Sequence, residues 1–385
     1  MRSPDEELAD LEARHLRRVL RRIDSPQQPT VCMAGREYLN FSSNDYLGLA
    51  NDERLKSAMV EGVERFGVGS GASRLVCGTQ GPHSELESAL AAFKHAEAAL
   101  TFSSGYATAV GALSALMGKG DVIILDKLCH ASLIDGSRLS GATLRVYPHN
   151  DLDKLASHLE WAKKQTESTS ARVLVVTESV FSMDGDRAAL AEIVALKERH
   201  GAWLMLDEAH AFGVIGPSGR GLGAELGIED GRIDLQMGTL SKAAGLSGGY
   251  LCASRSLIDL LINRARSFIY STAPAPSLAF AARASIDLIA GDAGDDLRRR
   301  LWARVNQFAE GLGVSAESAI VPVILGSNEA ALNAAEALKE SGFLIPAIRY
   351  PTVPRGQARL RVTLSAAHSA EQVNALLAAW GSSKS

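Results

Sequence analysis

The sequence has few cysteines, no long hydrophobic run and no excess of basic residues. Of its 385 residues only four are cysteine, and Cys32, Cys77, Cys129 and Cys252 lie far apart without a C-x-x-C pair. This spacing predicts neither a disulfide framework nor a zinc site, and we expect no bound metal. Polar residues interrupt the apolar stretches before they reach the roughly 20 residues of a membrane-spanning helix. With 40 Lys and Arg against 44 Asp and Glu, no overall basic field attracts nucleic acid.

The first residues do not resemble a secretory signal. Asp5, Glu6 and Glu7 stand where such a signal has cations followed by an apolar run. Together with the scattered cysteines, this predicts a cytoplasmic protein that does not enter a membrane. The apolar share of 46% and the charged share of 22% are ordinary for soluble globular proteins, and the length predicts two or three domains.

The N-terminal pattern predicts an amphipathic helix over residues 5–23. Its apolar residues recur at helical spacing, and Arg14, Arg18 and Arg21 share the opposite face. Pro26 then ends the pattern. Taken alone, such a row of arginines is most simply a solvated surface.

From about residue 83, helical and strand patterns alternate. The predicted helices are 83–95, 106–117, 151–163 and 188–199, and the predicted strands are 122–125, 171–177, 202–206, one ending at 239, and 250–253. Short, continuous apolar strands between helices indicate an α/β fold with a mainly parallel sheet covered on both faces. After residue 276 the pattern changes to long helices with strands 321–325 and 358–364. We therefore predict a large domain over 46–285 and a small C-terminal α+β domain over 286–385, with the arm 1–45 packed on the small domain.

Polar side chains follow several of the predicted strands where each strand ends. They are His130, Ser182, Asp207, His210 and Lys242. Because the carboxyl ends of parallel strands meet at one edge of a sheet, we expect these side chains to lie close together. Any one of them alone is a weak signal, but together they supply an amine, a carboxylate, two imidazoles and a hydroxyl.

This set of groups suits pyridoxal phosphate. Lys242, flanked by small residues, supplies the amine for a Schiff base, and the carboxylate of Asp207 suits the protonated ring nitrogen. The phosphate needs backbone N–H donors at a helix N-terminus. The segment 103–106, which opens the predicted helix 106–117, provides such donors.

Motifs spread along the chain make the assignment more specific. They are Asn40 to Leu49, Ser103 to Tyr106, His130 to Ser132, Val180 to Asp186, Asp207 to His210, Gly238 to Lys242, Ile348 to Pro354 and Arg359 to Leu364. Over nearly its whole length the chain resembles the α-oxoamine synthases, which are fold-type I pyridoxal phosphate enzymes. The resemblance implies a mainly parallel, seven-stranded type of sheet in the large, cofactor-binding domain.

The resemblance also implies a role for each site residue. It implies that Lys242 holds the cofactor and moves a substrate proton, that His130 stacks on the cofactor ring, and that Asp207 pairs with the ring nitrogen. These three are the expected catalytic residues. His210, with Ser182 nearby, is expected at the phenolic oxygen of the cofactor.

Further residues of the matching motifs are expected to bind the phosphate and the substrates. Gly105, Tyr106 and Thr239 would form the cradle for the phosphate and the ring. Thr272 would reach the phosphate of the partner subunit, because the resemblance implies a homodimer with shared active sites. For the substrates, the implied residues are Arg21, Asn44, Arg349 and Thr352. Arg349 would bind an amino-acid carboxylate and the other three would line the entrance, so that Arg21 is expected at the site rather than on a plain surface.

The activity that the resemblance implies is an acyl transfer. It is the decarboxylative condensation of L-alanine with a pimeloyl thioester, carried by coenzyme A or acyl carrier protein, in biotin biosynthesis. The rival activity within the family joins glycine to acetyl-coenzyme A and shares the cofactor residues. A binding module without activity would not need Lys242, Asp207 and His130 together. Tyr106 and Tyr350 depart from the usual pattern, where Phe and Pro are common, and so leave the acyl specificity open.

Overall fold

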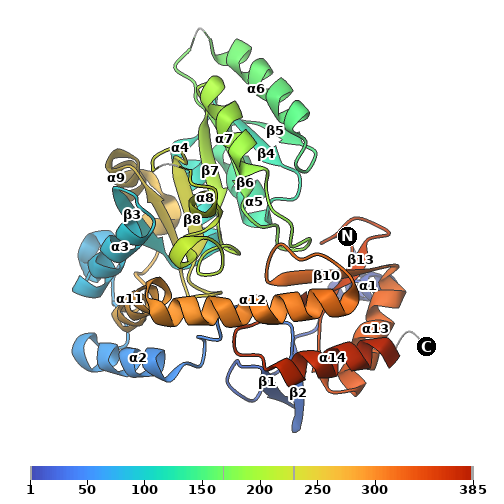
Figure 1. Cartoon of the computed structure of the whole chain (residues 1–385). Helices are drawn as coiled ribbons and strands as arrows, with labels where there is room; N and C mark the ends of the chain where they lie inside the picture. Colours follow the sequence, from blue (N-terminus) through green and yellow to red (C-terminus); the bar gives the residue numbers. More distant parts are fainter. Residues whose placement is uncertain (1, 168, 229, 383–385) are drawn as a thin grey trace. The chain divides into compact units, whose positions relative to one another are not determined.

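The structure is a computed structural model that describes residues 2–167, 169–228 and 230–382 (Figure 1). It divides into two compact units. The larger unit comprises Leu49–Ser182 and Asp186–Arg298, and the smaller comprises Met1–Gly48, Met183–Gly185 and Arg299–Ser385. The predicted boundary after residue 285 falls inside a helix of the larger unit, α11 (Pro276–Ala290). The predicted identities of the domains stay predictions.

A seven-stranded sheet organises the larger unit. Its spatial order is β3-β9-β8-β7-β6-β4-β5. The strands are β3 (Ala98–Phe102), β4 (Val122–Asp126), β5 (Thr143–Tyr147), β6 (Val173–Glu178), β7 (Trp203–Asp207), β8 (Leu235–Thr239) and β9 (Gly249–Ala253). Within the spatial run β8-β7-β6-β4-β5, each strand pairs in parallel with its neighbour. The strand β9 runs antiparallel to both of its neighbours, β3 and β8. The predicted mainly parallel sheet is confirmed.

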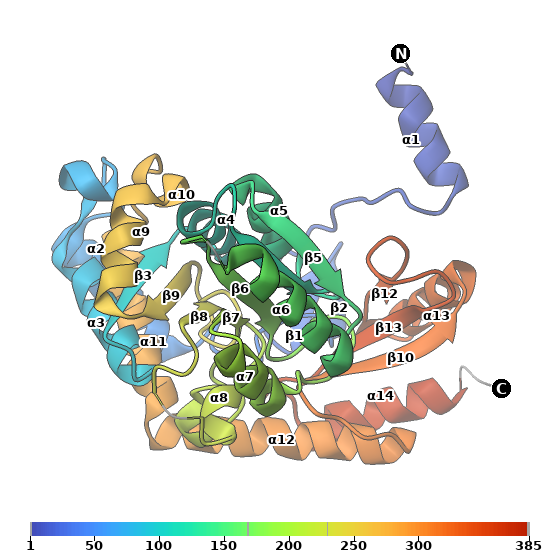
Figure 2. The same cartoon turned by 90° about the horizontal axis from the view of Figure 1, so that it is seen from above.

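Five helices connect successive strands of this sheet (Figure 2): α4 (Gly105–Leu116), α5 (Ala131–Ser140), α6 (Leu152–Thr166), α7 (Leu190–Arg199) and α8 (Leu222–Glu225). In the chain, α2 (Glu53–Phe66) and α3 (Gly81–Phe93) precede its first strand, and α9 (Arg255–Arg264), α10 (Arg266–Ile269) and α11 follow its last. The larger unit also contains a short π-helix, Arg74–Gly78, and a 3₁₀ turn, Pro217–Gly219.

The buried residues of the central strands explain why the sheet needs helices on both faces. Ile123 and Leu125 of β4 belong to a hydrophobic cluster with residues of α4, α5 and α9. Ile124, which points to the opposite face because side chains alternate along a strand, is also fully buried. A strand that is buried on both sides must be apolar throughout, and this is the pattern from which β4, β6 and β7 were predicted.

The smaller unit contains two three-stranded sheets. One is formed by β1 (Thr30–Met33), β2 (Arg36–Asn40) and β11 (Phe343–Leu344), and the other by β10 (Ile320–Gly326), β13 (Ala358–Thr363) and β12 (Ala347–Ile348). Its helices are α1 (Pro4–Ala13), α13 (Asn328–Glu340) and α14 (Ala370–Ser382), together with the part of α12 (Asp292–Leu312) that follows residue 298.

The predicted N-terminal helix over 5–23 is wrong in its second half. The helix α1 begins after the cap Ser3, which forms a capping box with Glu6, and ends at Ala13. Arg14 is its C-cap, and His15 has a φ of 55° in the left-handed region. The helix has no buried residue, so no packing extends it beyond its local capping signals. Arg18 and Arg21 therefore lie on non-helical chain.

Within the described ranges, every helix is too short or too polar to cross a bilayer. The same residues contain no group of three or more His, Cys, Asp and Glu side chains placed to hold a metal ion.

Candidate active site

A cavity of about 230 Å³ lies in the larger unit, and most of the predicted strand-end residues line it. Its lining residues are Ser104, Gly105, Tyr106, His130, Ser132, Glu178, Asp207, Ala209, His210, Met237, Thr239, Ser241 and Lys242. Because parallel strands expose their carboxyl ends at one edge, residues more than 130 positions apart share this space. The cavity contains an amine, two carboxylates and two imidazoles.

Asp207 is the last residue of β7 and is 5% exposed. Its Oδ1 accepts a hydrogen bond of 2.9 Å from the backbone N–H of Ala209. Burial raises the pKa of the Asp207 carboxyl, while the positive charge of Lys242 opposes that rise. A positive charge beside this carboxylate would therefore be strongly favoured, because it compensates for the hydration that the ionised carboxylate loses on burial.

Lys242 lies in the loop between β8 and β9, and its Nζ is 2.8 Å from Nε2 of His210. When Nζ donates in this contact, Nε2 of His210 accepts and the ring proton of His210 is on Nδ1. The backbone before the lysine is fixed by Thr239, whose Oγ1 donates to the carbonyl of Gly248 at 2.8 Å. The amine thus reaches the cavity from a well-defined turn.

His130 is the N-cap of α5. Its Nδ1 accepts from the backbone N–H of Ser132 at 3.2 Å and lies 2.8 Å from the Ser132 hydroxyl. An accepting Nδ1 places the ring proton on Nε2. Burial lowers the pKa of His130, and the charge of Lys242 adds to this effect, whereas Asp207 opposes it. The ring is held as a neutral imidazole with a fixed orientation.

Glu178 is a cavity residue that the sequence reasoning missed. It ends β6, is in register with Asp207 on β7, and is 3% exposed. One of its carboxylate oxygens accepts from the backbone N–H of His130. Burial and the negative charge of Asp207 raise the pKa of Glu178 well above its usual range. In the sequence, the one signal for Glu178 is its position at the end of an apolar run. The pairing of that strand with the strand of Asp207 is known only from the structure.

The start of α4 has the geometry expected of an anion cradle. Ser104 caps the helix, and its hydroxyl accepts from the backbone N–H of Ala107 at 3.1 Å. The first backbone N–H groups of a helix have no acceptor within the helix and attract anions. At Gly249, a Cβ would lie 2.6 Å from the backbone N of Gly105, so β9 approaches the helix start closely. Only a glycine permits this approach.

Two predicted cofactor residues are not among the residues that line the cavity. Ser182 follows β6 in the larger unit, four residues beyond Glu178. Thr272 pairs with Ser73 in an isolated antiparallel bridge. Their predicted roles stay predictions.

The predicted substrate residues all belong to the smaller unit. Arg349 donates to the backbone carbonyl of His15, and Arg18 Nη2 donates to Oγ1 of Thr352 at 3.3 Å. Arg349 and Thr352 line a cavity of about 810 Å³ with residues of the N-terminal segment, and Arg21 is not among the lining residues. Burial, followed by the charges of Arg18 and Arg21, lowers the pKa of Arg349.

Asn44, the fourth predicted substrate residue, accepts a hydrogen bond of 3.3 Å from the hydroxyl of Tyr46. This bond lies within the smaller unit and is separate from the cavity lined by Arg349. The structure therefore places Arg349 and Thr352 in one cavity, which neither Asn44 nor Arg21 lines, although the charge of Arg21 acts on Arg349.

Residues 36–379 match the family described as aminotransferase class I and II. An 8-amino-7-oxononanoate synthase from Janthinobacterium sp. (strain Marseille) is 46% identical, and the match covers 97% of this chain and 96% of that protein. A serine palmitoyltransferase from S. paucimobilis, solved with bound PLP-myriocin, has a TM-score of 0.90 at 31% identity and covers 98% of this chain and 95% of its own. An 8-amino-7-oxononanoate synthase from Francisella tularensis has a TM-score of 0.75 at 29% identity, with 90% and 98% covered. The predicted fold-type I class is confirmed.

Proposed function

This chain belongs to the aminotransferase class I and II family and, within it, to the 8-amino-7-oxononanoate synthases, and we propose on this basis that it makes 8-amino-7-oxononanoate. The reaction is the decarboxylative condensation of L-alanine with a pimeloyl thioester in biotin biosynthesis. It releases carbon dioxide and the free carrier, either coenzyme A or acyl carrier protein. The observation that carries the proposal is that Lys242, Asp207 and His130 share one cavity.

The residues of the cavity fit pyridoxal phosphate, the cofactor of this family. Asp207 is a carboxylate whose pKa is raised chiefly by burial, and a pyridinium nitrogen beside it would supply a positive charge that favours its ionised form. The amine of Lys242 lies in the same space, and the helix start at Gly105 supplies N–H donors for a phosphate. When bound, the cofactor withdraws electrons from the α-carbon of the amino acid.

Lys242 is the proton carrier of the proposed reaction. As a free amine it takes the proton from the α-carbon of alanine, and after carbon dioxide has left it returns a proton to that carbon. His210 accepts a hydrogen bond from Nζ and keeps the amine oriented toward the cavity. Asp207 meanwhile keeps a proton on the ring nitrogen, which stabilises the negative charge on the substrate.

Further residues are proposed to position the cofactor. His130 is a neutral, oriented ring that would cover one face of the cofactor, and His210 would contact the phenolic oxygen, with Ser182 nearby. Gly105, Tyr106 and Thr239 are proposed to hold the phosphate and ring. We also propose a homodimer in which Thr272 contributes to the site of the other subunit.

The smaller unit supplies the proposed substrate residues. Arg349 is proposed to bind the carboxylate of alanine, and Arg21, Asn44 and Thr352 are proposed to line the entrance for the acyl chain. The burial of Arg349 supports its role, since a partly desolvated guanidinium gains more from a carboxylate than a solvated one does. We place the reaction in the cytoplasm.

The test of the proposed function compares two substrate pairs on the purified holoenzyme. The kcat/KM for alanine with pimeloyl-coenzyme A is expected to exceed that for glycine with acetyl-coenzyme A. A preference for the glycine pair would assign the rival activity and leave the cofactor assignment unchanged. Loss of both activities in Lys242→Ala separates catalysis at this site from a contaminant.

A further inference from the structure

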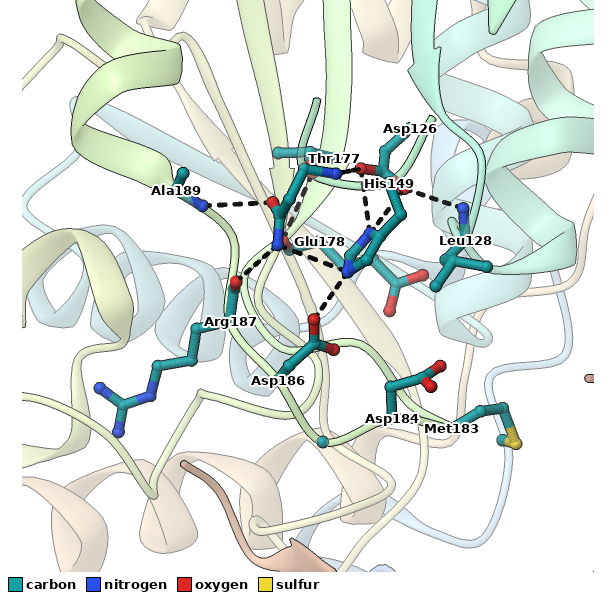
Figure 3. A network of polar contacts seen from close by, with 12 residues as sticks. Asp126, Leu128, His149, Thr177, Glu178, Met183, Asp184, Asp186, Arg187 and Ala189 are labelled. Atoms are coloured by element: carbon teal, nitrogen blue, oxygen red, sulfur yellow. Dashed lines mark hydrogen bonds and ion pairs between the residues drawn. The ribbon is translucent and has the colours of Figure 1, made fainter. Parts of the chain in front are cut away.

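His149 belongs to a network of polar contacts and does not itself line the cavity (Figure 3). His149, Asp126 and Asp186 all belong to the larger unit. His149 follows β5, two residues after Tyr147. Its Nδ1 lies 3.1 and 3.2 Å from the two carboxylate oxygens of Asp126, and its Nε2 lies 2.6 Å from Oδ2 of Asp186. Both ring nitrogens thus face a carboxylate.

With both carboxylates ionised, the hydrogen-bond chemistry gives a charged ring. Ionised carboxylates only accept hydrogen bonds, so each nitrogen of His149 must donate, and an imidazole with two N–H groups is an imidazolium. Burial lowers the pKa of His149, but the hydrogen bonds and charges of Asp126 and Asp186 outweigh burial and raise it to about 10. The ring also packs edge-on against Phe181, with a centroid distance of 4.3 Å.

One arm of the network leads to the turn that carries His130. Asp126 ends β4 and is fully buried. Its carboxylate accepts from the backbone N–H of Leu128 at 2.8 Å and of Asn150 at 3.0 Å, in addition to His149. Its carbonyl accepts from Cys129, the residue before His130. The conformation of this turn therefore depends on a buried carboxylate that needs a cation.

The other arm leads to the loop that carries Ser182. Within this loop the backbone N–H of Phe181 donates to the carbonyl of Asp186 at 3.0 Å. Asn150, next to His149, donates from Nδ2 to the carbonyl of Arg187 at 3.0 Å and accepts from the N–H of Ala189 at 3.3 Å. The side chain of Asp186 and the backbone of Arg187 and Ala189 thus join this loop to the residues that follow β5, His149 and Asn150.

We propose that His149 is a positioning residue, an imidazolium that joins Asp126 to Asp186 and so fixes the turn before His130 and the loop around Ser182 in relation to each other. The importance of these two loops rests on the proposed function, which places His130 and Ser182 at the cofactor. His149 itself does not line the cavity and acts through other residues.

The charge of the ring is tested by ¹⁵N NMR of holoenzyme with labelled histidine, with the His149 signals assigned by their loss in His149→Gln. Two protonated ring nitrogens at pH 8 are expected. The charged groups that face the ring are Asp126 from β4 and Asp186 from the loop, while the Arg187 guanidinium pairs with Glu225 at 2.7 Å instead. A single protonated nitrogen at pH 8 would overturn the proposal.

The positioning role is tested by the dissociation constant of pyridoxal phosphate from the apoenzyme and by the visible circular dichroism of the bound cofactor. In His149→Gln the dissociation constant is expected to rise about tenfold or more, the effect usual when supporting hydrogen bonds around a bound group are lost, and the dichroism band to change. Asp186→Asn should change both in the same direction and to a smaller extent. His95→Gln is the matched control, since His95 pairs at 3.4 Å with Asp230 on the surface of the same unit.

Asp186→Asn decides the outcome if His149→Gln does not fold, because Asp186 is 36% exposed and its substitution leaves no deeply buried charge without a partner. A wild-type dissociation constant and dichroism band in Asp186→Asn, and in His149→Gln if it folds, would contradict the proposal. These measurements need no acyl substrate. Failure of the proposed function would instead appear as an absence of cofactor binding or of condensation in the wild type.

Discussion

The chain places charged side chains in two contrasting surroundings. In the cavity of the larger unit, Glu178 and Asp207 are buried and their pKa values are raised, chiefly by the loss of water. In the segment 14–22 of the smaller unit, Arg14 and Arg17 are about half exposed and pair with Asp10 and Glu12 of α1. Electrostatic energies are large where water is excluded and small where it screens the charges.

This difference in exposure predicts that the buried carboxylates take part in catalysis and that the exposed arginines take part in substrate recognition. A buried carboxylate can hold a proton or a cation against bulk water and so can change the course of a reaction. An exposed arginine gains energy only when a ligand displaces its water, so it contributes to affinity and to substrate choice.

The largest effect is expected from Lys242→Ala. Removing the amine removes the proposed proton carrier, and kcat should fall by about 10²–10⁴-fold or more. The measurement is product formation from alanine and pimeloyl-coenzyme A, with the exposed Lys119→Ala as the matched control. Activity within tenfold of the wild type would show that another base acts.

Asp207→Asn is expected to retain the cofactor and to lose about 10²–10³-fold in kcat, because an amide does not hold the ring nitrogen protonated. Cofactor content is read from the visible absorbance, and turnover is measured on the same samples. A loss smaller than about tenfold, or about 1.4 kcal/mol, would contradict the proposed role of the buried carboxylate.

The free energy of unfolding should depend more on a buried ion pair than on an exposed one, and this can be measured without any ligand. Glu87 forms a two-pronged ion pair with Arg74, whose side chain is 5% exposed. Glu87→Ala leaves that buried cation without its partner and is expected to lower the free energy of unfolding by about 3–5 kcal/mol. Asp10→Ala, which breaks the exposed pair with Arg14, should cost less than about 0.5 kcal/mol. Equal costs in denaturant unfolding would refute the contrast.

Arg21→Ala tests recognition at the exposed segment. If Arg21 accepts the distal end of the pimeloyl chain, its loss removes a charge-assisted hydrogen bond of about 1.5–3 kcal/mol and lowers kcat/KM for pimeloyl-coenzyme A roughly ten- to hundredfold. The acetyl substrate has no distal group and should be unaffected. Arg22, whose side chain is 90% exposed, gives the control variant Arg22→Ala. An unchanged kcat/KM for the pimeloyl substrate would remove Arg21 from the site.

The smallest effect is expected from Glu178→Gln. Burial and the charge of Asp207 raise the pKa of Glu178 and so favour its neutral form. The amide of Gln resembles that form, and kcat should stay within about threefold, less than one typical hydrogen bond. Glu178→Ala, which removes the acceptor of the His130 N–H, is expected to cost more. A large loss in Glu178→Gln itself would show that the carboxylate works in its ionised form.

The strands of the sheet could be predicted where burial on both faces makes the sequence continuously apolar, as in β4, β6 and β7. The edge strand β5 was missed, because four of its five residues are partly buried or exposed and two of these are polar, so its sequence is not continuously apolar. The helix over 5–23 was predicted too long, since periodicity records which side chains share a face and not whether anything packs against that face.

The site was predictable where a residue type has one evident use, as for Lys242 and Asp207. Glu178 was missed because its place depends on the register of β6 with β7, which no spacing in the sequence reveals. His149 was missed for a similar reason: its two carboxylates come from residues 23 positions before it and 37 after it. Such partners become visible only in three dimensions.

The proposed function requires that Lys242 hold the cofactor in the cavity of the larger unit. It is tested most directly by borohydride treatment of the holoenzyme followed by peptide mapping, because reduction fixes the cofactor on the amine that carries it. The account predicts a single pyridoxyl label on Lys242. A label on Lys119, Lys127 or any other lysine would contradict it.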